Sequence, residues 1–151
     1  MDTMEPILAA HPLFKGLLPR DLKLILECAS RETFTTGQLL CQDNQEARKF
    51  YVIHHGRVAL EIHRARRGPV IITTLGGGEA LGWLWFDQPY HWHLDARALD
   101  LTRVISLDVQ GLLERCDRDH DFGYELMRRY AQHLAVQFRA LKVQLADFYG
   151  K

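Results

Sequence analysis

The sequence predicts an α+β fold in which helices at both ends of the chain flank a β-rich middle. Apolar residues recur at helical spacing near the N-terminus, and helical spacing returns over 109–149. Between them, over 31–108, short runs of β-forming residues alternate with turn residues. Strands grouped in this way are typical of a sandwich or barrel and not of a sheet built from βαβ units.

Length and composition are those of an ordinary soluble protein. The 151 residues suit one domain over 1–151, with helices over 5–30, strands over 31–108 and helices over 109–149. Nineteen basic residues balance nineteen acidic ones, which argues against a free-standing nucleic-acid binder and against a polybasic membrane module. The apolar runs are too short to cross a membrane, and the three cysteines are widely spaced, so we expect reduced thiols and a cytoplasmic location.

The N-terminal helical segment contains two breaks. Pro12 and Gly16 indicate a turn, and Pro19 suits the first turn of a new helix. The new helix is predicted to have one apolar face, formed by Leu22, Ile25, Leu26 and Ala29.

Short strands are predicted over 32–34, 39–41, 50–53, 58–63, 70–75, 91–99 and 103–107. The segment 91–98 alternates strictly between polar and apolar residues, as on a strand with one buried face. The alternation predicts that Trp92, Leu94, Ala96 and Ala98 point inward, and that His91, His93, Asp95 and Arg97 point outward.

The C-terminal third predicts a short helix over 109–115 and a long one over 122–149. On the long helix, apolar residues step alternately by three and four for more than three heptads. Such a seam could pack on the protein's own barrel, but a helix of this length would overhang a small barrel. We therefore expect a parallel two-helix dimer seam, formed by Tyr124, Met127, Ala131, Leu134, Phe138, Leu141, Leu145 and Phe148.

Four segments follow one another in a familiar order: HPLFKGL at 11–17, FTTGQ with DN over 34–44, FYVI with GRV over 50–58, and LGGGEALG at 75–82. Together they resemble the cyclic nucleotide-binding domain, the sensor half of Crp/Fnr-type bacterial regulators. The resemblance implies a double-stranded β-helix, or jelly-roll β-roll, flanked by N-terminal helices and a long C-terminal helix. Asn44 stands where the family prefers Gly, and Asn tolerates the left-handed conformation well.

The resemblance also places a phosphate-binding cassette after Gly82. In the family, a Glu directly after this Gly binds the ribose, and an Arg about ten residues on pairs with the cyclic phosphate. Here Trp83 takes the Glu position, and Trp92 or His93 takes the Arg position. Each lost contact is worth about 1.5–3 kcal/mol, or roughly two to four decades of affinity together, so we expect weak or no cyclic AMP binding.

The rings of the cassette allow three interpretations. They fill a collapsed pocket, they line a site for a flat or apolar ligand, or some are exposed and dock a partner. The candidate ligand-binding residues are Gly82, Trp83, Leu84, Trp85, Trp92 and His93.

Metal and catalytic chemistry find little support in the sequence. His91, His93 and Asp95 could bind a transition metal, but ligands on a single strand rarely complete a coordination shell, so we expect a solvated face and no metal. No serine or cysteine stands in a recognisable pattern with a base, and the glycine run 76–78 lacks the Lys and Ser/Thr of a P-loop, so we expect no enzyme.

The sequence thus favours a non-enzymatic small-molecule sensor or regulatory module that dimerises through Met127, Leu134, Phe138, Leu141 and Leu145. The residues identify no cofactor with certainty, and a cyclic nucleotide or another small ligand are the candidates. Two alternatives stay open. The chain is a ligand-free protein-interaction subunit, or it is the sensor half of a Crp/Fnr regulator without its helix-turn-helix. Since the chain ends at Lys151, directly after the long helix, we expect it not to bind DNA.

Overall fold

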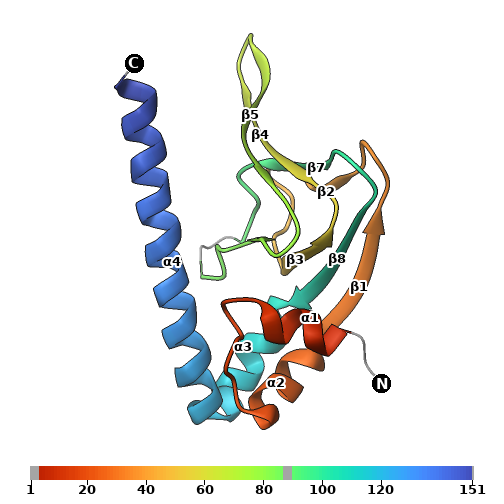
Figure 1. Cartoon of the computed structure of the whole chain (residues 1–151), viewed down its shortest axis with the longest axis vertical. Helices are drawn as coiled ribbons and strands as arrows, with labels where there is room; N and C mark the ends of the chain where they lie inside the picture. The colour runs from red at the N-terminus through yellow and green to blue at the C-terminus, as the bar shows by residue number, and fades with distance from the viewer. Residues whose placement is uncertain (1–3, 87–89, 151) are drawn as a thin grey trace.

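A computed structural model describes residues 4–86 and 90–150. Three short helices gather below a β-roll, and a fourth, much longer helix rises beside it (Figure 1). The helices are α1 (Met4–Ala10), α2 (Pro19–Leu26), α3 (Val109–Arg118) and α4 (His120–Tyr149).

The roll consists of two four-stranded antiparallel sheets in the described part of the chain, with strand orders β1-β8-β3-β6 and β2-β7-β4-β5. The predicted α+β fold with a two-sheet β-roll is therefore confirmed. The strands are β1 (Ala29–Phe34), β2 (Leu39–Cys41), β3 (Lys49–His55), β4 (Val58–Arg64), β5 (Gly68–Leu75), β6 (Ala80–Leu81), β7 (Asp95–Ala98) and β8 (Thr102–Asp108).

Two apolar cores lie on the two sides of β3. Phe50 and Val52 face the helices, whereas Tyr51 and Ile53 face the inside of the roll, and all four are buried. A strand that is covered on both faces needs a continuous apolar run, which explains why this segment does not alternate.

The structure shifts several predicted boundaries. β1 begins at Ala29, so the N-terminal helical part is shorter than 5–30. β7 covers only Asp95–Ala98, because the chain before it leaves the β4 ladder and pairs with the turn after β2. There, the Trp92 N–H donates to the Gln45 carbonyl at 2.8 Å, and the Asn44 N–H donates to the Trp92 carbonyl at 2.7 Å. Asn44 has a φ of 68°, the left-handed conformation that the sequence favours at this position.

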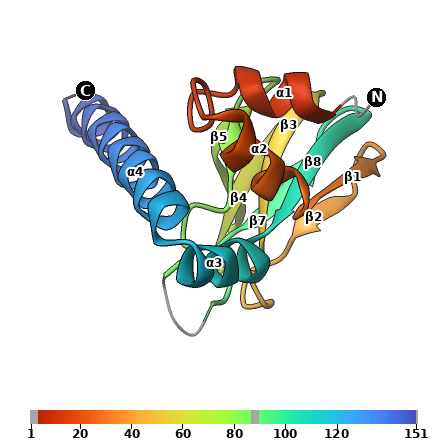
Figure 2. The same cartoon turned by 90° about the horizontal axis from the view of Figure 1, so that it is seen from below.

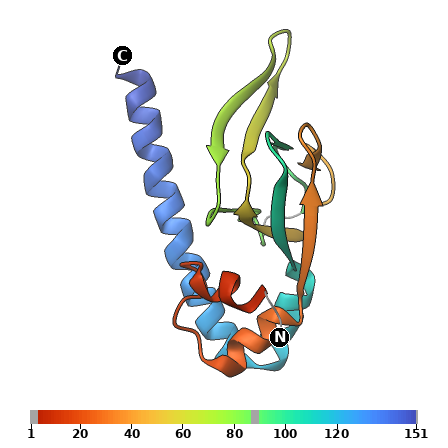
Figure 3. The same cartoon turned by 45° about the vertical axis from the view of Figure 1, so that its right-hand side comes forward.

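α4 is packed in its first half and exposed in its second. Phe122, Leu126 and Tyr130 are buried in the helical core, while every residue over 135–150 is exposed. Seen from below and from the side, α4 runs away from the helical base and along the β4–β5 hairpin (Figures 2 and 3). Near its end, the Gln144 amide donates to the Ile72 carbonyl of β5 at 3.2 Å. No helix among the described residues combines the length and apolar character needed to span a membrane.

The predicted seam on α4 divides between these two halves. Met127 and Leu134 are partly buried against the protein's own helical core, whereas Phe138, Leu141 and Leu145 are 56–63% exposed. The protein's own core therefore takes part of a surface that the sequence assigns entirely to a partner helix. The helix turns a different row of residues toward the core. This row consists of Phe122, Leu126 and Tyr130, which are spaced by four residues.

Candidate functional site

Gly82 opens the cassette in a conformation that only glycine adopts readily. Its φ is 101°, and a Cβ atom there would lie 2.7 Å from the Lys49 carbonyl oxygen and 3.3 Å from the Trp92 ring. The close approach of backbone and ring at this point seats the start of the cassette tightly against β3.

Trp92 fills the inside of the β-roll. Its side chain points inward, as the alternation predicts, and the residue is 8% exposed. The ring stacks on Tyr51 with centroids 6.2 Å apart, and the Tyr51 hydroxyl donates to the Leu40 carbonyl at 3.3 Å. An indole thus packs in the interior from one of the two positions that the resemblance aligns with the family's phosphate-binding Arg.

Trp83 and Trp85 pack on the other side of β3, in the helical core. Trp83 lies against Phe50 with centroids 4.8 Å apart, and it stacks on His133 of α4 at 6.1 Å. Trp85, only 2% exposed, stacks on Tyr130 at 4.5 Å. Trp83 and Trp92, which the sequence groups in one candidate ligand site, therefore belong to different cores on opposite faces of one strand.

The hydroxyl of Tyr130 joins the cassette to α4. It donates to the Trp83 backbone carbonyl and accepts from the backbone N–H of Trp85, the latter at 3.2 Å. Burial raises the pKa of Tyr130, so the hydroxyl keeps its proton at neutral pH. Sequence reasoning missed this residue. Phe122, Leu126 and Tyr130 follow one another at intervals of four residues, and this spacing is the signal of a second apolar row on α4.

The remaining cassette candidates lie at the surface. Leu84 is 47% exposed, and His93 is exposed as well. Phe86, next to the buried Trp85, is 57% exposed. The six residues predicted as one ligand site thus divide among the roll interior, the helical core and solvent. They do not converge on one cavity.

Two open clefts lie outside the roll, where α1 approaches the β1-β8-β3 sheet. The larger, of about 630 Å³, is lined in part by Ile7, Arg31, His54 and Arg103. The smaller, of about 460 Å³, shares Ile7 and His54 with it. Partial burial and, to a lesser degree, the neighbouring His55, Arg31 and Arg103 lower the pKa of His54.

The N-terminal turn is also tied to α4. The Arg129 guanidinium donates to the backbone carbonyls of Leu13 and Lys15, at 3.3 and 2.6 Å. In the same turn, the Leu13 N–H donates to Nδ1 of the buried His11 at 3.1 Å. Burial, and to a lesser degree the neighbouring His133, lowers the pKa of His11 to about 4.

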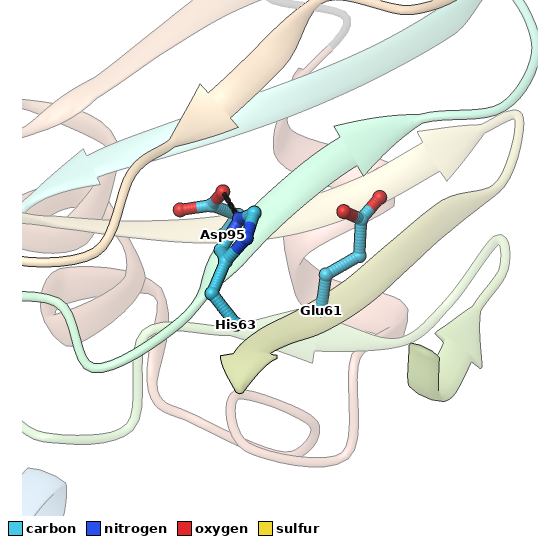
Figure 4. Close-up of side chains that lie close together, drawn as sticks. All are labelled: Glu61, His63 and Asp95. Atoms are coloured by element: carbon cyan, nitrogen blue, oxygen red, sulfur yellow. Dashed lines mark hydrogen bonds and ion pairs between the residues drawn. The ribbon is translucent and has the colours of Figure 1, made fainter. Parts of the chain in front are cut away.

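A charged cluster lies on the outer face of β4 and β7. His63 Nε2 is 2.6 Å from Asp95 Oδ2 (Figure 4). Arg97 Nε is 3.0 Å from Glu61 Oε1. Burial alone would raise the pKa of Asp95, but hydrogen bonds from the Asp43 N–H and from His63 hold it below its usual value.

The interpretation of this outer face as solvated is wrong for Asp95, which is only 7% exposed. A side chain and a turn from elsewhere in the chain cover it. Arg97 faces outward, as predicted, and pairs with Glu61 away from the roll interior.

The chain belongs to the cyclic nucleotide-binding domain family, whose model matches residues 31–119. No curated protein matches the sequence. Among solved structures, the chain is similar to a candidate cyclic nucleotide-binding protein from Geobacter metallireducens GS-15, with 23% identity, a TM-score of 0.77, and coverage of 91% of this chain and 99% of that one.

Two further structures share the fold. One is the N-terminal domain of a transcriptional regulator from Streptomyces coelicolor A3(2), with 22% identity, a TM-score of 0.74, and coverage of 89% of this chain and 94% of that one. The other is the Thermus thermophilus catabolite activator protein, also at 22% and 0.74, with coverage of 91% of this chain and 63% of that one. At these identities, the likeness establishes the shared fold.

Proposed function

We propose that this protein is a non-enzymatic, homodimeric regulatory module that has lost cyclic AMP binding in the family's usual pose. The observation that carries the proposal is the packing of Trp92, which stacks on Tyr51 inside the roll. A cyclic phosphate placed at this point would have to displace a buried indole and would meet no guanidinium. Trp83, at the ribose-binding position, is held in the other core by Phe50 and His133.

The proposed signal path joins the cassette to α4. Tyr130 bonds to the backbone on both sides of Leu84, so a displacement of this segment changes the seating of α4. The exposed half of α4 is the proposed output surface. It carries Val136, Phe138, Leu141, Val143, Leu145, Phe148 and Tyr149, each at least 45% exposed.

The occupant that we propose for this surface is a second copy of the chain. Phe138, Leu141, Leu145 and Phe148 continue a three-and-four spacing, which is the pattern of a two-helix coiled coil, and we propose that its helices run parallel. Apolar patches of this extent on a soluble protein mark interaction surfaces.

Sedimentation of a double variant tests the dimer. Phe138→Lys with Leu141→Lys places charges in the seam without touching the protein's own core, whereas Leu134 would be a poor choice because it is partly buried there. We expect the double variant to sediment as a folded monomer. The exposed Gln137→Lys is the matched control and keeps the dimer. A double variant that sediments as the same dimer would show that the seam is wrongly assigned.

Calorimetric titration with cyclic AMP tests the loss of nucleotide binding. We expect weak or no binding, since both the Glu and the Arg of the family are absent. Sub-micromolar affinity would overturn this part of the proposal. It would require Trp92 to leave the roll interior, which fluorescence of the indoles would detect.

A second candidate function is a ligand-free interaction subunit. The filled roll favours it, as do the exposed Leu84 and Phe86 beside the buried Trp85. Native mass spectrometry of freshly purified protein separates the candidates, because a sensor carries a small molecule and an interaction subunit does not. The third alternative, the sensor half of a transcription regulator, gains support if the coding sequence continues into a helix-turn-helix.

A further inference from the structure

Two buried carboxylates lie directly opposite each other on the outer face of the β2-β7-β4-β5 sheet. Glu61 of β4 pairs in register with Asp95 of β7, and the two residues are 5% and 7% exposed. Like charges at directly opposed positions destabilise a sheet, and burial increases the cost. Nearby cations are therefore needed to offset the repulsion between the two carboxylates.

The protein supplies one permanent cation to this pair. Arg97 Nε is 3.0 Å from Glu61 Oε1, and the guanidinium also donates to the Gly37 carbonyl at 3.0 Å. Asp95 instead has the Asp43 N–H at 2.7 Å and His63 Nε2 at 2.6 Å. With a neutral imidazole, the four side chains carry a net charge of −1, so the cluster is able to accept a further positive charge.

We propose that Glu61, His63 and Asp95 form a binding site for a divalent transition metal ion of the zinc class. Each offers one ligand atom, and these atoms all lie within 4.8 Å of one another. One imidazole nitrogen and two carboxylate oxygens are ligands that zinc accepts, with water in the fourth position. The three side chains project to the same side of the two strands (Figure 4).

Only small movements separate the present arrangement from a coordination shell. Ligand atoms about 2.0–2.2 Å from a tetrahedral zinc ion lie roughly 3.3–3.5 Å apart. His63 and Asp95, now 2.6 Å apart, would open by less than about 1 Å, and Glu61 would close in by at most about 1.5 Å. The side chain of His63 is 48% exposed, so it has room to turn. The ion would replace the direct contact between His63 Nε2 and Asp95 Oδ2.

This site differs from the combination of His91, His93 and Asp95 that the sequence offers as candidate metal ligands. The sequence places His91 and His93 on one strand with Asp95, but the strand begins only at Asp95. The imidazole that reaches Asp95 comes from His63, on the neighbouring strand, 32 residues earlier.

Zinc titration of the chelator-treated protein, followed by calorimetry, tests the proposal. We expect one zinc ion per chain at this site and at least a tenfold loss of affinity in His63→Gln. Asp95→Asn, which keeps its shape and can still accept from the Asp43 N–H, is expected to lose affinity to a similar degree. The matched control is His55→Gln, because the exposed rings of His54 and His55 lie 4.4 Å apart and offer a rival pair of ligands.

Cobalt substitution provides a second readout, since the visible absorption of Co²⁺ reports its ligands. His63→Gln is expected to change the spectrum and His55→Gln to leave it unchanged. The proposal is overturned if the parent protein binds no zinc, if His63→Gln binds it as tightly as the parent, or if binding is lost in His55→Gln. Because these variants leave the apolar residues of α4 unchanged, either result leaves the sedimentation test of the dimer independent.

Discussion

Replacing Tyr130 by phenylalanine removes a single oxygen atom from the joint between the cassette and α4. The ring remains, and with it the stacking on Trp85 at 4.5 Å. What is lost is the hydroxyl that donates to the Trp83 carbonyl and accepts from the Trp85 N–H. Tyr130→Phe therefore isolates the hydrogen bonds from the apolar packing.

The expected cost follows from the burial of the groups left behind. Trp85 is only 2% exposed. Its backbone N–H would therefore lose its partner in a place that water reaches poorly. A buried polar group left without a partner costs about 1–3 kcal/mol. We therefore expect Tyr130→Phe to lower the free energy of unfolding by about 1–3 kcal/mol.

Urea denaturation followed by indole fluorescence measures this change directly. The slope of the free energy against urea is expected to stay constant, since the surface exposed on unfolding is almost the same. Tyr124→Phe is the matched control, because Tyr124 is on the same helix and 71% exposed, and it should change stability by less than about 0.5 kcal/mol. Equal stabilities for Tyr130→Phe and the parent would refute the claim that the Tyr130 hydroxyl stabilises the contact between the cassette and α4.

Three further predictions concern stability. Trp92→Ala opens a cavity inside the roll and is expected to cost about 3–5 kcal/mol in thermal or urea unfolding, and an unchanged midpoint would contradict its packing. Gly82→Ala combines backbone strain of about 1–3 kcal/mol with a close contact, so it is expected to cost more than Gly37→Ala, which has a positive φ but open space around it. Because burial lowers the pKa of His11 to about 4, protonation opposes folding, and stability should fall as the pH drops from 6.5 toward 4. His11→Asn, which can still accept from the Leu13 N–H, should show a shallower fall in urea midpoints between pH 7 and 4.5, and an unchanged fall would refute the assignment.

Local features of the sequence predicted much of the architecture. The continuous apolar run over 50–53 marks a strand buried on both faces, and Asn44 marks a left-handed turn, because both depend on neighbours within a few residues. The C-terminal helices over 109–149 were predictable for the same reason, since a helix face repeats within one or two turns.

The candidate site was less predictable, because it depends on which strands become neighbours. Asp95 is buried only because His63 and the turn at Asp43 come from other parts of the chain to cover it. Strand alternation reports which face a side chain takes, but it does not report what lies above that face.

By itself, the sequence determined the family and most of the order of helices and strands, and it predicted the replacement of the family's two ligand-binding residues. The tertiary structure decided how the cassette rings divide. Trp83 and Trp92 are nine positions apart, and only the path of β3 between them separates one into the helical core and the other into the roll. It also decided which row of α4 packs against the protein's own core. Phe122, Leu126 and Tyr130 are buried there, while Phe138 and Leu141 lie beyond the helical base and are exposed. Helical spacing identifies apolar rows on a helix, but the surface that each row meets depends on contacts between residues distant in the chain.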